Sequence, residues 1–414
     1  MDNQTIQSEN LFDEPEDVGD YHLLRNLVQA RRQSGRKATS VLYDIARLSW
    51  KTKRVIDPEF YFKHRLFDLA ESDTKAMYGY LDPIAMVKLN KSINFDRQSL
   101  SAIDNKTYLE HILRAEGLPV VKTLAILSEN KLSPSKGCSS VEEAVTFFRN
   151  CNDYPIFGKP NQSSRSAGVT SVTKYDRESD TLTLENKGGI SPKQFAEELF
   201  RAYGEFGYIF QSKLEPHDSL KPCCGNAIGC IRLLTLAEPD NIVPLYSVWK
   251  IPANGEIADN FWRSDNKVAA IDTNTGLIQR VQAGTGVQRT VELKDPISGI
   301  VFSGFQLPDW ERLVKLGCEA AALFQHIPVL GWDIAMTQSG PVIVEGNTNP
   351  DHSLYQLAYG TGLASSEAGL RLRNSSDLRK SRRKKAVKEM KKKIRDNAKN
   401  KAKKAVTQGF DVSS

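Results

Sequence analysis

Cysteine is scarce in this sequence, and the few cysteines show no spacing typical of a zinc pair or a redox motif. There are six, at Cys138, Cys151, Cys223, Cys224, Cys230 and Cys318. This sparse pattern argues against both a disulfide-stapled scaffold and a paired-cysteine metal module. We therefore expect buried or incidental thiols in a protein of the reducing cytoplasm.

Long apolar runs are also missing. No uncharged apolar run approaches the length of a membrane span, and residues 1–20 are acidic and polar, unlike a signal peptide. The sequence contains no Gly-Lys-Ser/Thr phosphate loop, no glycine-rich dinucleotide fingerprint in its first hundred residues and no internal repeat. We expect a soluble protein that is neither a P-loop enzyme nor a repeat array.

The net charge of +6 hides a strong asymmetry. Residues 371–404 contain 17 basic and 3 acidic residues, a net charge of +14, so the rest of the chain carries −8. Any attraction to an anionic partner therefore belongs to this tail and not to the folded body.

With 414 residues, the chain is long enough for two or three domains. Apolar residues at helical spacing dominate the first hundred positions, and strands alternate with helices after residue 104. This pattern predicts an α+β protein with mostly antiparallel strands. The predicted segments are a disordered N-terminus (1–20), a helical module (21–103), two α+β segments (104–210 and 211–366) and a basic helical or disordered tail (367–414).

Residues 331–351 carry the strongest chemical signal. Two apolar runs flank Gln338-Ser339-Gly340, which predicts a three-residue hairpin loop. In that register Asp333 faces Glu345, and Asn347 lies on the same side of the ribbon. The alternating apolar residues would point to the opposite side, and they are Ile334, Met336, Val342 and Val344.

Two carboxylates held side by side repel each other unless a cation lies between them. Carboxylate and amide oxygens, with no histidine or cysteine nearby, favour magnesium, which is commonly shared with nucleotide phosphates. We therefore predict that Asp333, Glu345 and Asn347 are magnesium ligands. The alternative is a surface hairpin with solvated acids.

Two basic residues stand where a charge needs a partner. Lys159 ends a predicted strand and leads into a small polar loop, an arrangement that suits phosphate but also fits a plain surface turn. Arg232 lies inside an apolar strand, where it either forms a buried ion pair or faces phosphate or an acyl phosphate. Both interpretations remain open for each residue.

Together these features resemble the ATP-grasp superfamily, and most closely its sugar-transfer-associated branch, which is linked to exopolysaccharide or capsule synthesis. The resemblance extends over residues 58–365, and the hairpin is its most specific part. It implies an ATP-grasp fold, in which two α+β lobes clasp a nucleotide, here with a helical N-terminal module and a basic C-terminal tail. The other matching features are Asn105-Lys106, Lys159-Pro160, Gln211-Ser212-Lys213-Leu214 and Asp259-Asn260.

The resemblance implies ATP and Mg²⁺ as cofactors, with the metal held by the hairpin residues. It assigns Lys106 and Lys159 to the phosphates, and Lys159 and Arg232 to catalysis. A small-residue loop would cover the phosphates, and it contains Ser163, Ser164, Ser166 and Gly168. The strand end with Gln211, Lys213 and Leu214 would contact adenine, and His217 or a neighbouring acid would reach the ribose.

Three further sequence features bear on the site, namely an Asp-Asn pair and two histidines. Asp259-Asn260 matches an element of this branch, but Arg263-Ser264-Asp265 follows where the branch tends to have small glycines. His217, as a lone histidine, is more typical of a structural role than of catalysis. His352 follows the hairpin closely enough to line the active site.

The tail predicts a strongly basic, narrowly amphipathic helix, with Val387, Met390, Ile394, Ala398 and Ala402 at helical spacing. Acidic phospholipid, an anionic polysaccharide or its lipid-linked precursor, and RNA are candidate partners. Nucleic acid is disfavoured because no aromatic residue stands among the charges before Phe410. A disordered solubilising tail is the alternative, and membrane contact would place the protein at the inner face of the membrane.

The leading functional hypothesis is an ATP-dependent ligase, in which a carboxylate is phosphorylated and a nucleophile such as an amine then displaces phosphate. Its acceptor would be linked to exopolysaccharide, capsule or another cell-surface glycan. A kinase acting on a sugar or hydroxyl group and a non-catalytic nucleotide-binding regulator are the two alternatives. No general base is evident in the sequence.

Overall fold

The structure is a computed structural model of the chain, and it describes residues 22–69, 75–95, 97–130, 136–161, 168–253, 255–259 and 266–409. The predicted disordered segment 1–20 and the predicted site residues Ser163, Ser164, Ser166 and Asn260 lie outside the described residues. Within the described part, the predicted α+β class is confirmed, with two seven-stranded sheets and helices on their faces.

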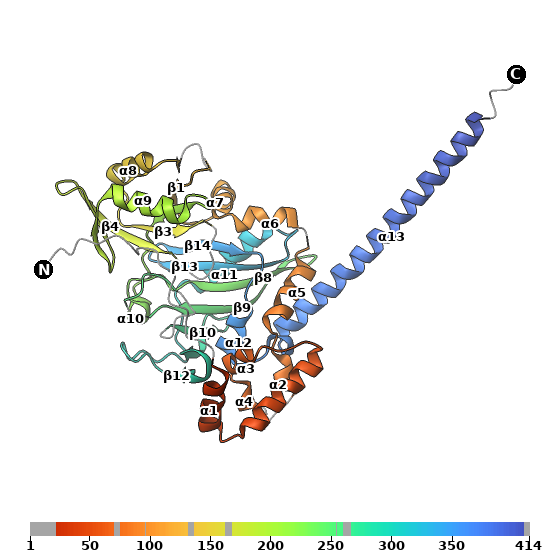
Figure 1. The fold of residues 1–414 in the computed structure, drawn as a ribbon, viewed down its shortest axis with the longest axis horizontal. Coiled ribbons are helices and arrows are strands. Elements are labelled where there is room, and N and C mark those ends of the chain that lie inside the picture. The colour runs from red at the N-terminus through yellow and green to blue at the C-terminus, as the bar shows by residue number, and fades with distance from the viewer. Residues whose placement is uncertain are drawn as a thin grey trace.

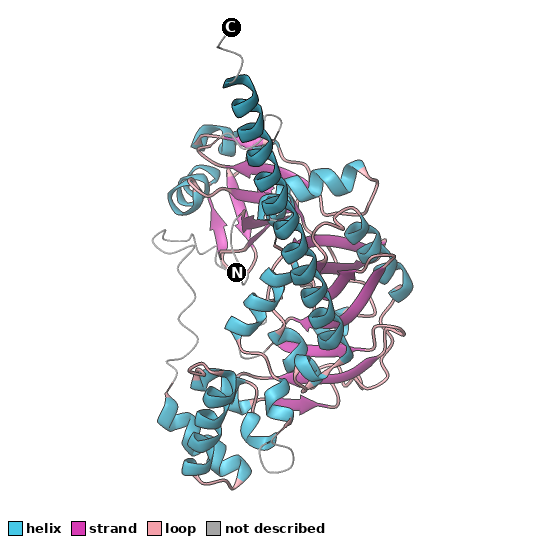
Figure 2. Cartoon of the chain, turned by 90° about the vertical axis from the view of Figure 1, so that its right-hand side faces the viewer, coloured by secondary structure: helices cyan, strands magenta, loops and turns pink. Residues whose placement is uncertain are grey.

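Helices form the N-terminal part of the chain, and the first four of them, α1 to α4, lie at the opposite end of the molecule from the first sheet in both views (Figures 1 and 2). Their first members pack around a separate apolar cluster that includes Tyr61, Phe62 and Phe67. The helices are α1 (Leu23–Ser34), α2 (Ala38–Thr52), α3 (Pro58–Lys63), α4 (Leu66–Leu69), η1 (Ala76–Gly79), α5 (Pro83–Ile93) and α6 (Arg97–Asp104).

The sequence predicts one helix over residues 59–70, and this prediction is wrong. The segment forms α3 and α4, because Arg65 between them adopts a positive φ of 49°, which a continuous helix cannot contain. Helices α5 and α6 fall almost wholly within the predicted helical segment 21–103, but their individual bounds were not predicted.

The first sheet lies under α8 (Val141–Asn150) and α9 (Pro192–Tyr203), whose apolar faces share one core with it. Ser140 and Ser191 cap these two helices by accepting backbone hydrogen bonds. In spatial order the strands are β2 (Gly137–Cys138), β1 (Thr123–Leu127), β7 (Tyr208–Ser212), β3 (Ile156–Pro160), β4 (Thr170–Asp176), β5 (Thr181–Leu184) and β6 (Gly188–Ile190). The neighbouring strands are antiparallel, except that β1 and β2 are parallel.

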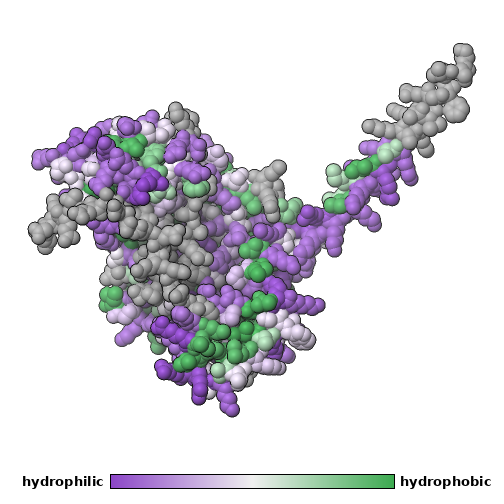
Figure 3. Space-filling view, viewed as in Figure 1, coloured by the Kyte–Doolittle hydropathy of each residue, from purple (hydrophilic) through white to green (hydrophobic). Residues whose placement is uncertain are grey.

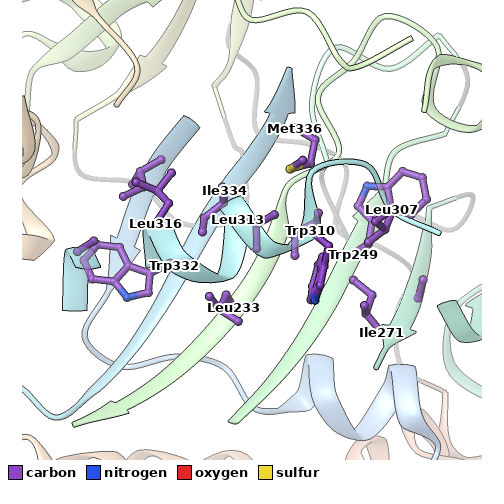
Figure 4. Packing of buried hydrophobic residues seen from close by; sticks show 14 of the residues in the cluster. Leu233, Trp249, Ile271, Leu307, Trp310, Leu313, Leu316, Trp332, Ile334 and Met336 are labelled. Carbon is purple, nitrogen blue, oxygen red and sulfur yellow. The ribbon is translucent and has the colours of Figure 1, made fainter. Parts of the chain in front are cut away.

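The second sheet is entirely antiparallel. Helix α11 (Trp310–Ala322) packs on one face through large apolar side chains such as Leu313 and Leu316, which meet Trp332 and Ile334 (Figure 4). In spatial order the strands are β12 (Thr290–Glu292), β11 (Ile278–Ala283), β10 (Lys267–Ile271), β9 (Ile242–Ile251), β8 (Ile231–Ala237), β13 (Val329–Thr337) and β14 (Gly340–Asn347).

The other face of the second sheet is covered by α12 (Ser353–Tyr359), with α5 and the start of α13 (Glu367–Gly409) joining the same apolar cluster. Helix α13 then leaves the body and projects away from it (Figure 1). The remaining short elements are α7 (Lys106–Ala115), α10 (Lys221–Cys224), η2 (Gly286–Gln288) and η3 (Leu363–Ser365). Among the described residues, no helix combines the length and apolar character needed to cross a membrane.

The hairpin of β13 and β14 corrects two predictions, the loop length and the apolar side of β14, and confirms that Asp333 faces Glu345. The loop has two residues, because Thr337 pairs with Gly340, and Ile334 pairs with Ile343. A β-bulge between these pairs and the next then shifts the register, so Asp333 still faces Glu345. Consequently Ile343, and not Val342, shares the buried apolar side with Ile334, while Val344 lines a cavity.

Candidate functional site

A cavity of about 440 Å³ lies between the two sheets and collects most of the predicted site residues. Its lining comes from β3, β7 and the start of α7 on one side, and from β8, β9, β13 and β14 on the other. The predicted residues in the lining are Lys106, Lys159, Gln211, Lys213, Leu214, Arg232, Asp259, Asp333, Glu345 and Asn347.

Two lysines lie on the side of the first sheet. Lys159 is buried near the end of β3, and burial lowers its pKa, with Glu345 opposing this shift and Lys106 adding to it. Lys106 stands in the first turn of α7, directly after the capping residue Asn105, and donates to the backbone oxygen of Asn161 at 3.2 Å. The fold therefore directs two positive charges towards one cavity.

The end of β7 supplies the residues that were assigned to the nucleotide base. Gln211 is buried and donates through Nε2 to the hydroxyl of Thr123 at 3.2 Å. The ammonium of Lys213 donates to the carboxylate of Glu185 at 2.6 Å. Leu214 follows in the lining, where the apolar side chain of Phe157 also lies.

Two residues assigned to the nucleotide do not line the cavity. The ring of His217 bonds to the hydroxyl of Ser219, and its backbone N–H donates to the oxygen of Met336 near the hairpin turn. Gly168 accepts a hydrogen bond from the hydroxyl of Tyr208, while its neighbour Val169 lines the cavity. The geometry therefore does not bring His217 or Gly168 to the other site residues.

Asp333 lies at the centre of a buried charge network on the second sheet. Arg232 donates to both of its carboxylate oxygens, through Nε at 2.5 Å and Nη2 at 2.9 Å. Lys250 donates to Asp333 at 3.1 Å and lies 3.0 Å from the carboxylate of Asp259, which also accepts from the backbone N–H of Cys230. Two cations and two anions thus alternate across β8, β9, β13 and the loop after β9.

The network sets the ionisation of its members. Burial alone would raise the pKa of Asp333, but the charges of Arg232 and Lys250 outweigh burial and hold the pKa below its usual range. Burial is also the largest effect on Asp259, and it raises the pKa of that carboxyl although Lys250 opposes the shift. The pKa of Lys250 is raised, because both carboxylates outweigh its burial.

The magnesium prediction can be tested against the donor set. Asp333, Glu345 and Asn347 all line the cavity, and carboxylate and amide oxygens are hard donors that suit Mg²⁺. However, Asp333 already has two cationic partners, so the two facing carboxylates do not by themselves require a metal. The donor types fit the ion, with Asp333 sharing its oxygens, and the assignment stays a prediction. In the described part of the chain, no group of three or more His, Cys, Asp or Glu residues could hold a metal on its own.

The sequence did not identify several residues of the lining. Lys250 is, like Arg232, a cation inside an apolar strand, and this pattern is the signal that could have identified it. The thiol of Cys230 lines the cavity, and burial raises its pKa well above the usual value. Asn349 and Asp351, directly after the hairpin, also reach the cavity, and only their position in the chain could have suggested it.

His352 does not line the cavity, and the expectation that it does is wrong. Its ring is fully buried behind the hairpin, where it bonds to the hydroxyl of Tyr246 at 2.9 Å and to Oδ1 of Asn90 at 2.7 Å. Burial lowers the pKa of His352 to about 4, so the ring is neutral at neutral pH. It connects α5 to the chain that follows β14.

Comparisons with known proteins agree with this architecture. A family described as sugar-transfer associated ATP-grasp matches residues 87–369. The comparison with curated proteins found no match.

Two ligases are among the solved structures to which this chain is similar. The VanG D-Ala:D-Ser ligase of Enterococcus faecalis is 15% identical, with a TM-score of 0.40, and the alignment covers 67% of this chain and 62% of that one. The D-alanine-D-alanine ligase of Coxiella burnetii is 15% identical, with a TM-score of 0.38 and coverage of 72% and 63%. The chain thus spans somewhat less than two thirds of these ligases. At such TM-scores the family assignment rests on the match to residues 87–369 and not on the structures.

Proposed function

Because the chain belongs to the sugar-transfer associated ATP-grasp family, we propose that it is an ATP- and magnesium-dependent ligase. It would activate a carboxylate as an acyl phosphate for attack by an amine or another nucleophile. The observation that carries the proposal is one cavity whose lining contains the cations Lys106, Lys159, Arg232 and Lys250 together with the oxygen donors of the β13–β14 hairpin. Cations on both sides of a cleft suit a ligand with several phosphates.

Each part of the cavity has a role in this proposal. The ammonium groups of Lys106 and Lys159 would hold the phosphates, and the end of β7 with Gln211 would contact the adenine. Arg232 is the catalytic cation, although its guanidinium is already paired with Asp333. We therefore assign Arg232, while it stays paired with Asp333, to stabilising negative charge that develops on the reactants in the cavity. We assign the same role to Lys250. In-line positioning of the reactants, and not a general base, supplies the remaining rate enhancement.

Asp333, Glu345 and Asn347 would hold the magnesium ion. When bound, the ion would neutralise charge on the phosphate oxygens during transfer. The carboxylate of Glu345 is the sharpest probe of this assignment, because Asp333 also holds two cationic side chains together and its replacement would disturb them.

We propose that the acceptor is linked to exopolysaccharide, capsule or another surface glycan, and that the reaction takes place in the cytoplasm. The family description supports a connection to sugar transfer. The six cysteines are free thiols in the structure, which suits a reducing compartment.

The test is an assay of ATP consumption with a panel of glycan carboxylates, such as uronic acids, offered with and without primary amines. A ligase releases ADP and free phosphate only when both a carboxylate and a nucleophile are present. A phosphorylated product without free phosphate would replace the ligase with a kinase. Nucleotide binding without any turnover across the panel would favour a regulator.

In the same assay, Glu345→Gln should lower turnover by on the order of 100-fold, because one anionic donor is lost from the metal site. Glu116→Gln is the matched control, since Glu116 is an exposed carboxylate outside the cavity. Unchanged turnover in Glu345→Gln would remove the metal assignment.

A further inference from the structure

One stripe of helix α13 begins in the core and ends in solvent. Leu372 and Ser376 are buried, and the hydroxyl of Ser376 lies 2.6 Å from that of Ser92 on α5. One turn further, Arg379 and Arg383 lie over the ring of Phe95, at 5.8 and 6.0 Å from its centre. The side of the helix that packs on α5 is therefore fixed up to Arg383.

The same stripe continues beyond the body. Val387, Met390 and Ile394 follow at helical spacing, and they are 45%, 65% and 60% exposed. Figure 3 shows apolar side chains along one side of the projecting helix and hydrophilic ones along the other. Among the described residues, these three large apolar side chains have no protein surface to pack on.

The surroundings of this stripe are strongly basic. Residues 379–400 contain 12 basic and 2 acidic residues. Of these, Lys388, Lys391, Lys392, Lys393 and Arg395 flank the stripe, and all are exposed. A narrow apolar line between lysines is the pattern of a helix that lies in a membrane interface, with its apolar line inserted and its ammonium groups at the phosphates.

We propose that the projecting part of α13, from residue 384 onward, docks on the surface of an anionic phospholipid bilayer. The helix would lie in the plane of the headgroups with Val387, Met390 and Ile394 inserted. This positions the rest of the chain next to the membrane through the rigid contact between α13 and α5. The inference does not depend on the reaction proposed above, because no residue of the cavity takes part in it.

Two other occupants fit the stripe less well. A second copy of α13 packed along the stripe would bring two rows of lysines together, and their repulsion would oppose the contact. RNA would match the charge but leave the apolar line unused, and no aromatic side chain stands on this part of the helix for stacking on bases. A bilayer matches both the charge and the apolar line.

The test is co-sedimentation of the full-length protein with vesicles made of equal parts phosphatidylserine and phosphatidylcholine. Binding should be strong at low salt, weaken steeply as salt is added, and be absent with vesicles of phosphatidylcholine alone. Lys391→Gln with Lys392→Gln and Lys393→Gln should weaken binding by about fivefold per lysine, roughly 100-fold in total.

The apolar line needs its own variant. Met390→Gln with Ile394→Gln keeps the charge and a good helix former at both sites, and should weaken binding by about tenfold or more. Leu293→Gln with Ile297→Gln is the matched control, because both residues are similarly exposed on the body. The control should bind as the unchanged protein does.

The outcomes separate the occupants. No binding to the anionic vesicles overturns the proposal, as does equal binding by the Met390→Gln/Ile394→Gln protein and the unchanged protein. If an unstructured polyuridine RNA binds and the vesicles do not, α13 is a nucleic-acid element. A dimer that Met390→Gln/Ile394→Gln dissociates would assign the stripe to a second copy.

Discussion

At the scale of single residues, the ion pair of Arg232 and Asp333 answers a question that the sequence left open. A charged side chain inside an apolar strand must be paired or lie at a ligand. Arg232 is paired with Asp333 and also lines the cavity, so both descriptions apply to it. Lys250 completes the pairing of both carboxylates. Four charges in one buried row are mutually dependent, because removal of any one leaves a buried neighbour unpaired.

His352 gives a prediction for the pH dependence of stability. Its pKa is lowered from 6.5 to about 4 in the folded protein, so the unfolded chain binds more protons between these values. The stabilising contribution is complete above pH 6.5 and is lost as the pH falls towards 4. Between pH 7 and pH 5, the unfolding free energy should fall by on the order of 2 kcal/mol through this residue.

The measurement is urea denaturation of the unchanged protein and of His352→Gln at both pH values. The variant is less stable at pH 7, because its amide replaces the ring imperfectly, but it should lose about 2 kcal/mol less between pH 7 and pH 5. His326→Gln is the control, since His326 is exposed. If His352→Gln has the same pH dependence as the unchanged protein, the histidine is not held neutral by its surroundings.

Residue chemistry made part of the site predictable. Asp333, Glu345, Asn347 and Lys159 could be found because each is a polar residue in an apolar strand or at its end. His352 could not be placed, because its position after the hairpin does not say whether the chain turns the ring towards the cavity or behind it. That choice is made by Tyr246 and Asn90, which are far away in the sequence.

At the scale of elements, the hairpin shows how two errors can cancel. The loop was predicted one residue too long, but the β-bulge adds one residue to β14, so the facing pair of Asp333 and Glu345 came out as predicted. The apolar side of β14 was not predicted correctly. Between the loop and the bulge the register differs by one residue from the predicted register, and a shift of one residue turns each side chain to the opposite side of a strand. Bulges depend on packing and have no reliable sequence signal.

Strongly patterned elements were predicted closely. The sequence pattern predicts strands over residues 123–127, 181–184 and 278–283 and a helix over residues 192–203, and these bounds are those of β1, β5, β11 and α9. The bounds of helix α5 were not predicted, although Asp82 caps it and Pro83 begins it. Its buried residues are Met86, Asn90 and Ile93, and because Asn90 is polar, the apolar stripe that marks a surface helix is interrupted.

Helix α5 gives the prediction at this scale. Asn90 donates through Nδ2 to the side chain of Asn349 and to the backbone oxygen of Pro350, both at 3.0 Å, and it also bonds to His352. Asn90→Ala should therefore free the chain after β14, with a loss of about 2 kcal/mol or more in stability. The substitution should accelerate amide hydrogen exchange in a peptide covering residues 347–352, and it should accelerate exchange less in a peptide covering residues 333–343.

Ser92→Ala is the matched control on the same helix. Ser92 bonds to Ser376 of α13 and to its own helix, so its loss should leave exchange at residues 347–352 unchanged. If residues 347–352 exchange as slowly in the Asn90→Ala protein as in the unchanged protein, other contacts hold this segment.

At the scale of the whole molecule, charge and packing divide the chain at different points. The acidic body and the basic tail meet near residue 371, but the packed part of α13 continues through Leu372 and Ser376 to the arginines over Phe95. Charge in the sequence marks where the basic segment begins, but it could not show that the first turns of α13 belong to the core. The cavity also belongs to this scale, because its two walls come from different sheets.

Truncation distinguishes these two boundaries. A chain that ends at residue 383 loses only the projecting part of α13, so its thermal midpoint and any ATP turnover should equal those of the full chain. A chain that ends at residue 370 also loses the buried side chain of Leu372 and the contact between Ser376 and Ser92, and exposes the cluster around Leu354 and Leu363. Burial of one leucine alone is worth about 2 kcal/mol or more, so the thermal midpoint should fall by several degrees, roughly 3 °C or more. Scanning calorimetry of the full chain and the two truncated chains is the measurement. If both truncated chains have the midpoint of the full chain, α13 contributes nothing to the stability of the body. If the longer truncated chain already has a lowered midpoint, the projecting part of α13 folds onto the body.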